Sequence, residues 1–202
     1  MASASKKITI VGGSGALGAG LAKRWARKGH QIIIGSRDEK RASEAASRLN
    51  NAAGTTSIVG MENKVASEHG EIVVLTVPFS NHMSTLSLIA PALDNKILID
   101  VTVPLVPPKV RTVHIPEGGS CAKAAQEFLG KAVRVVSAFQ SVAATHLDDL
   151  EHEIDCDVLV CGNDPEAREV VVELASDADM KAGHAGVIAN SIVAEAMTSS
   201  LI

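Results

Sequence analysis

The stretch that decides the fold is Ile8-Thr9-Ile10-Val11-Gly12-Gly13-Ser14-Gly15-Ala16-Leu17-Gly18, an apolar strand that runs into a glycine-rich turn and then into a helix-forming segment. Gly13, Gly15 and Gly18 fill the G-x-G-x-x-G pattern. The first glycine makes the tight turn, the second lets a pyrophosphate approach the backbone, and the third lets helix and strand pack closely. Free N–H groups at the helix start favour an anion. The turn therefore predicts a dinucleotide-binding site.

The second strand, residues 31–34, indicates which dinucleotide binds. An NAD site needs a carboxylate at this strand end for the ribose 2′-OH, but Gly35-Ser36-Arg37 stands there instead. Asp38 directly precedes a helix-forming run, so we interpret it as the N-cap of that helix. Ser36, Arg37 and either Lys40 or Arg41 can donate to a 2′-phosphate. The sequence predicts NADP rather than NAD.

Strands and helices alternate along the rest of the chain, which predicts an α/β fold of the Rossmann type, doubly wound, with a mainly parallel sheet and a small C-terminal helical or capping part. We expect one NADP-binding domain over residues 1–202, with about 137–202 forming the acceptor side and the dimer contact. Asp164 and Pro165 should start a helix as N-cap and first residue. Further strands are expected at 57–59, 72–77, 96–101, 132–138 and, as the last, 157–162, and helices at 39–50, 63–68, 81–92, 120–129, 166–175 and 185–202.

Ligands of such sheets lie outside the carboxyl ends of the strands. Three segments should reach that edge: Thr76-Val77-Pro78-Phe79, the loop 102–108, and residues 137–144. We expect the first two near the ribose and nicotinamide of the cofactor, and the third on the opposite wall.

Composition narrows the function classes. Of 202 residues 46% are hydrophobic, and the net charge of −4 with a pI near 6.0 gives no basic footprint for nucleic acid or an anionic membrane. Cys121, Cys156 and Cys161 lack metal or redox spacing and are interpreted as unreactive thiols of a reducing compartment. No signal-like or membrane-spanning apolar segment follows the leader, which predicts a cytoplasmic protein.

Residues for acid catalysis are missing from the sequence, which holds no tyrosine. We interpret His30, His69, His114 and His184 as surface or turn residues, and His146 and His152 as solvated; His82 is placed where it could touch the cofactor. We therefore expect no catalytic side chain and no metal. A small apolar nicotinamide site suits direct hydride exchange with another redox cofactor, which needs orientation more than proton transfer.

These residues resemble the NADPH-dependent reductases of coenzyme F420, the F420H2:NADP+ oxidoreductases. The resemblance covers nearly the whole chain and is carried by the glycine turn, Gly35-Ser36-Arg37, residues 74–78, 104–107, 135–138, 157–164 and Asn190-Ser191 with Glu195. It implies that the phosphates rest on Ser14, Gly15, Ala16 and Leu17, that Ser36, Arg37 and Arg41 hold the 2′-phosphate, and that Val77, Val106 and Ala144 surround the nicotinamide.

The same resemblance implies that F420 is the co-substrate, stacked on the nicotinamide so that hydride passes directly between the rings. Gln140 stands where some members have His, and we expect it to hydrogen-bond to a ring carbonyl. The alternatives are another acceptor (a flavin, quinone or ferric chelate) and a non-catalytic NADP sensor. The apolar helix expected at 185–202 predicts a homodimer.

Overall fold

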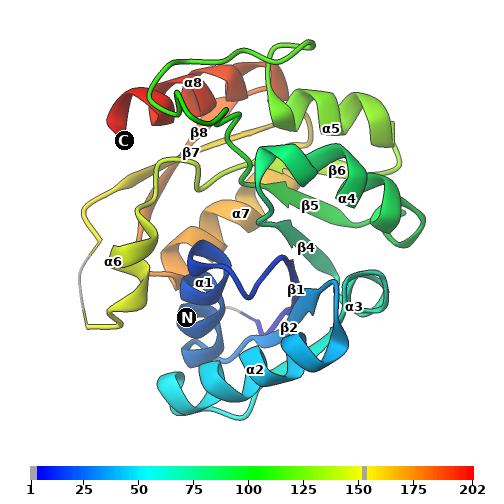
Figure 1. Ribbon diagram of the computed structural model, residues 1–202, viewed down its shortest axis with the longest axis vertical. Helices are drawn as coiled ribbons and strands as arrows, with labels where there is room; N and C mark the ends of the chain where they lie inside the picture. Colours follow the sequence, from blue (N-terminus) through cyan, green and yellow to red (C-terminus); the bar gives the residue numbers. More distant parts are fainter. Residues whose placement is uncertain (1–3, 152–153) are drawn as a thin grey trace.

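The computed structural model describes residues 4–151 and 154–202, which form one eight-stranded sheet in the order β3-β2-β1-β4-β5-β6-β7-β8 (Figure 1). The strands are β1 (Lys7–Val11), β2 (Gln31–Ser36), β3 (Ile58–Glu62), β4 (Ile72–Leu75), β5 (Ile97–Asp100), β6 (Arg134–Ser137), β7 (Asp157–Gly162) and β8 (Lys181–Gly186). The first six follow the strand order of a dinucleotide-binding fold and are parallel. The predicted Rossmann-type fold is confirmed.

Helices cover both faces of the sheet: α1 (Ala16–Arg27), α2 (Glu39–Ala53), α3 (Asn63–His69), α4 (His82–Ile89), α5 (Cys121–Leu129), α6 (Ala144–Asp148), α7 (Pro165–Asp177) and α8 (Ser191–Leu201). Alternate residues of β1, β4, β5 and β6 enter two cores, one on each face of the sheet. Ile8 and Ile10 pack with α1, α2 and α7, whereas Val11 packs with α4 and α5. Trp25 of α1 fills the larger core, where it meets Phe139 edge to face at 5.9 Å.

Side-chain caps start several helices where the sequence indicates. Asp38 caps α2 by accepting from the Arg41 N–H at 2.9 Å, and Asp164 caps α7 by accepting from the Ala167 N–H at 2.7 Å, with Pro165 as the first helical residue. Both predicted caps are confirmed. They matter for function because α2 begins at the end of β2, where the ribose is expected.

The C-terminal part differs from the expectation in two respects. Residues 157–162 are not the last strand, because β8 follows and pairs with β7 in parallel. The helix expected over 185–202 is therefore wrong at its start: residues up to Gly186 are strand, η3 (Ile188–Asn190) is a short 3-10 turn, and α8 begins only at Ser191. β7 also runs antiparallel to β6. β8 is largely exposed at the sheet edge and lacks the apolar alternation that would have identified it.

Smaller differences lie near the carboxyl edge. β4 ends at Leu75, two residues before the expected Val77, and the helix expected over 81–92 divides into α4 and the 3-10 turn η2 (Ala90–Ala92), with η1 (Phe79–Asn81) before it. The short helix α6 was not expected, because five residues hold too little local signal.

Candidate active site

The glycine turn joins β1 to α1 and is open where a ligand must approach. Gly15 is the N-cap of α1, with φ −75° and ψ 163°, and no side chain caps that helix. A Cβ at Gly15 would meet only the Gly12 carbonyl oxygen, at 3.4 Å. The space around Gly15 is therefore open, no side chain occupies the amino end of α1, and Ser14 and Ala16 beside it are exposed. This cradle fits a pyrophosphate.

The neighbouring glycines are enclosed instead. A Cβ at Gly13 would lie 2.7 Å from the Ile10 carbonyl oxygen, and one at Gly18 would lie 2.8 Å from the Thr76 Oγ1. Gly12 has φ +77°, which favours glycine, and its Cβ would be 2.9 Å from Val77 Cγ1. These contacts bring the turn directly against the segment after β4.

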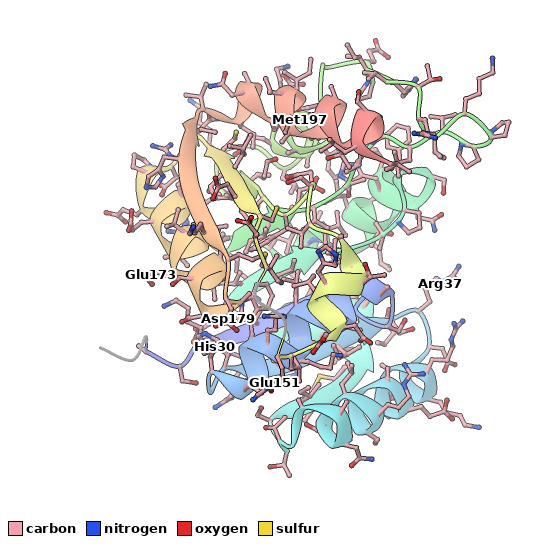
Figure 2. All side chains as sticks on the ribbon, turned by 90° about the vertical axis from the view of Figure 1, so that its left-hand side faces the viewer. His30, Arg37, Glu151, Glu173, Asp179 and Met197 are labelled. Carbon is pink, nitrogen blue, oxygen red and sulfur yellow. The ribbon has the colours of Figure 1, made fainter. Side chains whose placement is uncertain are left out.

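The end of β2 presents cationic and hydroxyl groups. Ser36 is buried, whereas Arg37 and Arg41 are exposed, and Arg37 projects from the molecule beside α2 (Figure 2). Asp38 uses its carboxylate to cap α2. The carboxylate of Asp38 is therefore bound to its own helix, and Ser36, Arg37 and either Lys40 or Arg41 are the groups that a 2′-phosphate could meet.

The apolar residues expected around the nicotinamide come from three segments at the carboxyl edge. Val77 and Pro78 follow β4, Val106 is 41% exposed in the long connection after β5, and Ala144 begins α6. The structure places Val77 against the glycine turn and α6 against α1. Val106 lies on an exposed loop.

A buried polar cluster under this edge was missed by the sequence analysis. Asp100, fully buried at the end of β5, accepts from the Thr102 N–H at 3.0 Å and lies 2.6 Å from His82 Nε2. Burial lowers the pKa of His82, but the hydrogen bond and charge of Asp100, with the charge of Glu195, outweigh it, and the pKa is raised. We call this buried cluster the floor of the site. His82 belongs to it through its bond to Asp100, and the exposed fraction of His82 is only 1%.

Gln140 also belongs to this floor. Its Nε2 donates to the Asp100 carbonyl at 2.9 Å and to Ser137 Oγ at 2.8 Å. The Asp100 carbonyl can only accept, so the amide nitrogen must be the atom that faces it. Both N–H groups are committed within the protein, and the expected hydrogen bond from Gln140 to a ring carbonyl is not available in this arrangement.

Glu195 joins α8 to the start of α5. Its carboxylate, 1% exposed, accepts from the Cys121 N–H at 2.7 Å and the Ala122 N–H at 3.1 Å. Ser191 of α8 meets Ser120, the cap of α5, at 2.7 Å. Burial raises the pKa of Glu195, the two N–H groups lower it, and the nearby charge of Asp100 raises it, giving a pKa of about 7.

We expect the stabilising contribution of Glu195 to fall as pH rises. Its folded pKa of about 7 exceeds the ordinary 4.5, so folding favours the protonated carboxyl. The contribution is complete below the unfolded pKa and is lost as pH passes through the folded one, by up to about 3 kcal/mol. Melting temperatures of wild type and Glu195→Gln, compared from about pH 5 to pH 8, should shift in favour of the variant with rising pH. Parallel curves would contradict this assignment.

The other histidines and the cysteines mostly match the sequence analysis, with one correction. His30 is buried: its Nδ1 accepts from the Lys6 N–H and its Nε2 lies 3.0 Å from Asp177, because the turn before β2 packs under α7. His69, His114, His146 and His184 are exposed; His152 lies outside the described residues. Burial raises the pKa of the Cys121 and Cys161 thiols, which opposes thiolate chemistry.

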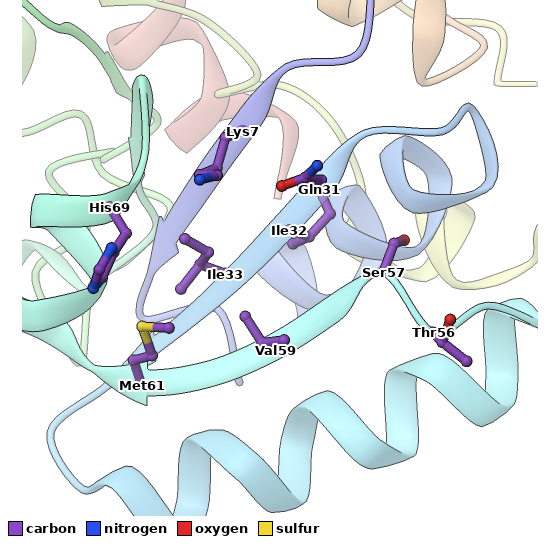
Figure 3. A pocket seen from close by; sticks show the side chains of 9 residues that line it. All are labelled: Lys7, Gln31, Ile32, Ile33, Thr56, Ser57, Val59, Met61 and His69. Atoms are coloured by element: carbon purple, nitrogen blue, oxygen red, sulfur yellow. The ribbon is translucent and has the colours of Figure 1, made fainter.

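A hollow of about 470 Å³ lies elsewhere, on the sheet beside α3 (Figure 3). Lys7 and Gln31 line it at the amino ends of β1 and β2, and Ile33, Val59 and Met61 form its apolar wall. The glycine turn follows the carboxyl end of β1, so this hollow is separate from the nucleotide cradle. Among residues 4–151 and 154–202, no three His, Cys, Asp or Glu side chains group to hold a metal ion, and no helix is long and apolar enough to cross a membrane.

Comparison with known proteins agrees with this geometry. The profile described as "NADP oxidoreductase coenzyme F420-dependent" matches residues 7–104. The F420-dependent NADP reductase of Methanocaldococcus jannaschii is 41% identical over 97% of this chain and 91% of its own, and that of Methanothermobacter thermautotrophicus is 38% identical over 97% and 88%. The crystal structure of a candidate F420-dependent NADP reductase from Arthrobacter sp. FB24 is 25% identical, with a TM-score of 0.76 over 95% of this chain and 89% of that chain.

The sheet order and the open glycine cradle define a Rossmann-type, dinucleotide-binding protein. Identity at this level over nearly the full length of both chains is decisive for the family. The chain belongs to the F420-dependent NADP reductases.

Proposed function

We propose that this chain transfers a hydride directly between NADP(H) and coenzyme F420. The names of its archaeal relatives state these two co-substrates. The observation that carries the proposal is the pairing of an open pyrophosphate cradle at Gly15 with a β2 end whose carboxylate, Asp38, is bound to its own helix. Such a site takes the phosphorylated dinucleotide.

The residues that would hold NADP come from two strand ends. Ser14, Gly15, Ala16 and Leu17 offer the backbone of the turn and the start of α1 to the pyrophosphate. Ser36, Arg37 and Arg41 would bind the 2′-phosphate, Arg37 through two parallel hydrogen bonds. The protein thereby fixes the adenosine half and leaves the nicotinamide half to the apolar edge.

At that edge the chain orients the rings and excludes water. When bound, NADPH supplies the hydride and F420 accepts it. Val77, Pro78, Val106 and Ala144 form the proposed apolar walls, and the side chains of His82 and Asp100 lie buried beneath them. None of these walls carries an acid or a base, so the contribution of the protein is proximity and orientation.

A spectroscopic assay tests the choice of acceptor. The protein is mixed with NADPH and oxidised F420, and the loss of the visible deazaflavin band is followed, with riboflavin, FMN and menadione in parallel. Turnover with F420 alone supports the proposal. Tight NADPH binding without turnover of any acceptor would replace it with an NADP sensor.

Arg37→Ala should separate NADPH from NADH. Loss of one charge-assisted contact to the 2′-phosphate should weaken NADPH by about 1.5 to 3 kcal/mol and leave NADH nearly unchanged. Arg48→Ala, at another exposed arginine of α2, is the matched control. Fluorescence titration of both nucleotides measures the effect, and equal losses for NADPH and NADH would refute the role of Arg37.

A homodimer, with residues 137–202 on the acceptor side, is part of the proposal. Val193, Met197 and Leu201 recur on one side of α8 and are 59%, 42% and 67% exposed. An exposed apolar face of this kind is typical of a subunit contact. Light scattering measures the mass directly, and a monomer at micromolar concentration would count against the dimer.

A further inference from the structure

The short helix α6 depends on side chains of α1 for its C-terminal hydrogen bonds. It has five residues, and the final carbonyls of a helix find no partner within it. Arg24 donates from Nη2 to the carbonyls of Asp149 at 2.7 Å and His146 at 3.2 Å, and from Nε to that of Leu147 at 3.4 Å. Lys23 donates from Nζ to the carbonyl and the carboxylate of Asp148, at 2.8 and 2.6 Å. Two cations of α1 therefore cap α6, where positive charge is also favoured by the helix dipole.

Packing at Gly20 brings the two helices together. Leu147 of α6 is fully buried, and a Cβ at Gly20 would collide with its side chain. Gly20, Lys23 and Arg24 lie three and four residues apart, so they share one side of α1. Arg24, itself 2% exposed, also donates to the Ala178 carbonyl and meets the Asp179 carboxylate, both at 3.3 Å. Figure 2 shows Asp179 beside the carboxyl end of α1.

The same helix thus carries the pyrophosphate cradle and the α6 support. Gly15 caps the amino end of α1, and Arg24 lies nine residues further along, roughly 13 Å at the helical rise. Ala144, proposed to line the nicotinamide, is the first residue of the supported helix. Because α1 is a continuous helix between the cradle and the support of α6, it sets the distance from the pyrophosphate to Ala144.

We propose that Gly20 and Arg24 are positioning residues, which act through α6 to hold Ala144 against the nicotinamide. They thereby fix how far the nicotinamide ring enters the site and which of its faces meets the acceptor. This inference rests on the proposed function of Ala144. Arg24 needs its planar fork for several carbonyls at once, which a lysine cannot reproduce. Gly20 needs the absence of a Cβ.

Two variants test the positions without removing a buried charge. Gly20→Ala improves the helix propensity of α1 but pushes α6 outward, and Arg24→Lys keeps the charge but loses the fork. The matched controls are Gly183→Ala, where a Cβ meets nothing within 4 Å, and Lys28→Met, which removes a second cation partner of Asp179 just after α1. Melting temperatures accompany all four proteins.

We expect NADPH affinity to stay nearly unchanged in Gly20→Ala and Arg24→Lys, because the phosphate contacts remain. The fluorescence anisotropy of the bound nicotinamide should fall, and single-turnover hydride transfer to F420 should slow by about tenfold or more. With NADPH deuterated on either face of C4, wild type should transfer from one face and the variants from both. The two controls should behave as wild type.

Variants with wild-type anisotropy and label transfer would overturn the proposal. So would losses of NADPH affinity that merely follow the melting temperature, since these indicate a structural role. If wild type fails to reduce F420, the proposed function falls instead. The anisotropy comparison needs no acceptor, so it still decides whether α6 positions the ring.

Discussion

Replacing Gly15 with valine should reduce NADPH binding below detection while the protein keeps its fold. The backbone of Gly15, at φ −75° and ψ 163°, suits a β-branched residue, and a Cβ there meets only the Gly12 carbonyl oxygen at 3.4 Å. The added methyl groups would therefore point into the open space above the first turn of α1. That is where the pyrophosphate must approach the backbone.

Fluorescence titration with NADPH, together with the melting temperature, measures this effect. Gly183→Val is the matched control, because Gly183 also has open space around it but lies on the edge strand β8. It should bind NADPH as wild type does. Normal NADPH binding by Gly15→Val would place the phosphate site elsewhere.

Ala144→Leu should slow hydride transfer by about a hundredfold, the effect expected of a displacement of about 1 Å between reacting rings. Gln140→Ala should slow hydride transfer by about tenfold or less, because the hydrogen bonds that it removes lie within the protein and do not reach the rings. Single-turnover measurements give the order of damage. Ala143→Leu, which alters the exposed neighbour of Ala144, is the control.

The opposite order would change the mechanism. If Gln140→Ala lost hydride transfer while Ala144→Leu kept it, a side chain would take part in the chemistry, and the mechanism of direct transfer would have to be abandoned. The two variants are comparable because both positions follow β6 closely, Gln140 in the connection and Ala144 at the start of α6.

The nucleotide half could be predicted from sequence because its signals are local. Gly13, Gly15 and Gly18 determine the turn by their spacing, and Asp38 identifies itself as a cap because a helix-forming run follows at once. The buried cluster could not be predicted, since Asp100 meets His82 across 18 residues and Glu195 meets Cys121 across 74. Only the tertiary fold brings such partners together.

Whether a residue is buried or exposed was harder to predict than its secondary structure. His30 is in a turn, as expected, yet it is buried because the amino end of β1 and α7 close over it. β8 escaped notice because an exposed edge strand has no buried face to impose alternation on its residues. The cap that Arg24 gives α6 could not be predicted either, because an arginine in a helical segment normally indicates a solvent-exposed position.

The contact of Glu195 with the start of α5 joins two helices that lie far apart in the sequence, because 74 residues separate Glu195 from Cys121. The N–H groups of Cys121 and Ala122 therefore gain this acceptor only when α5 and α8 come together in the folded protein. The two helices should consequently gain and lose their order as one cooperative unit.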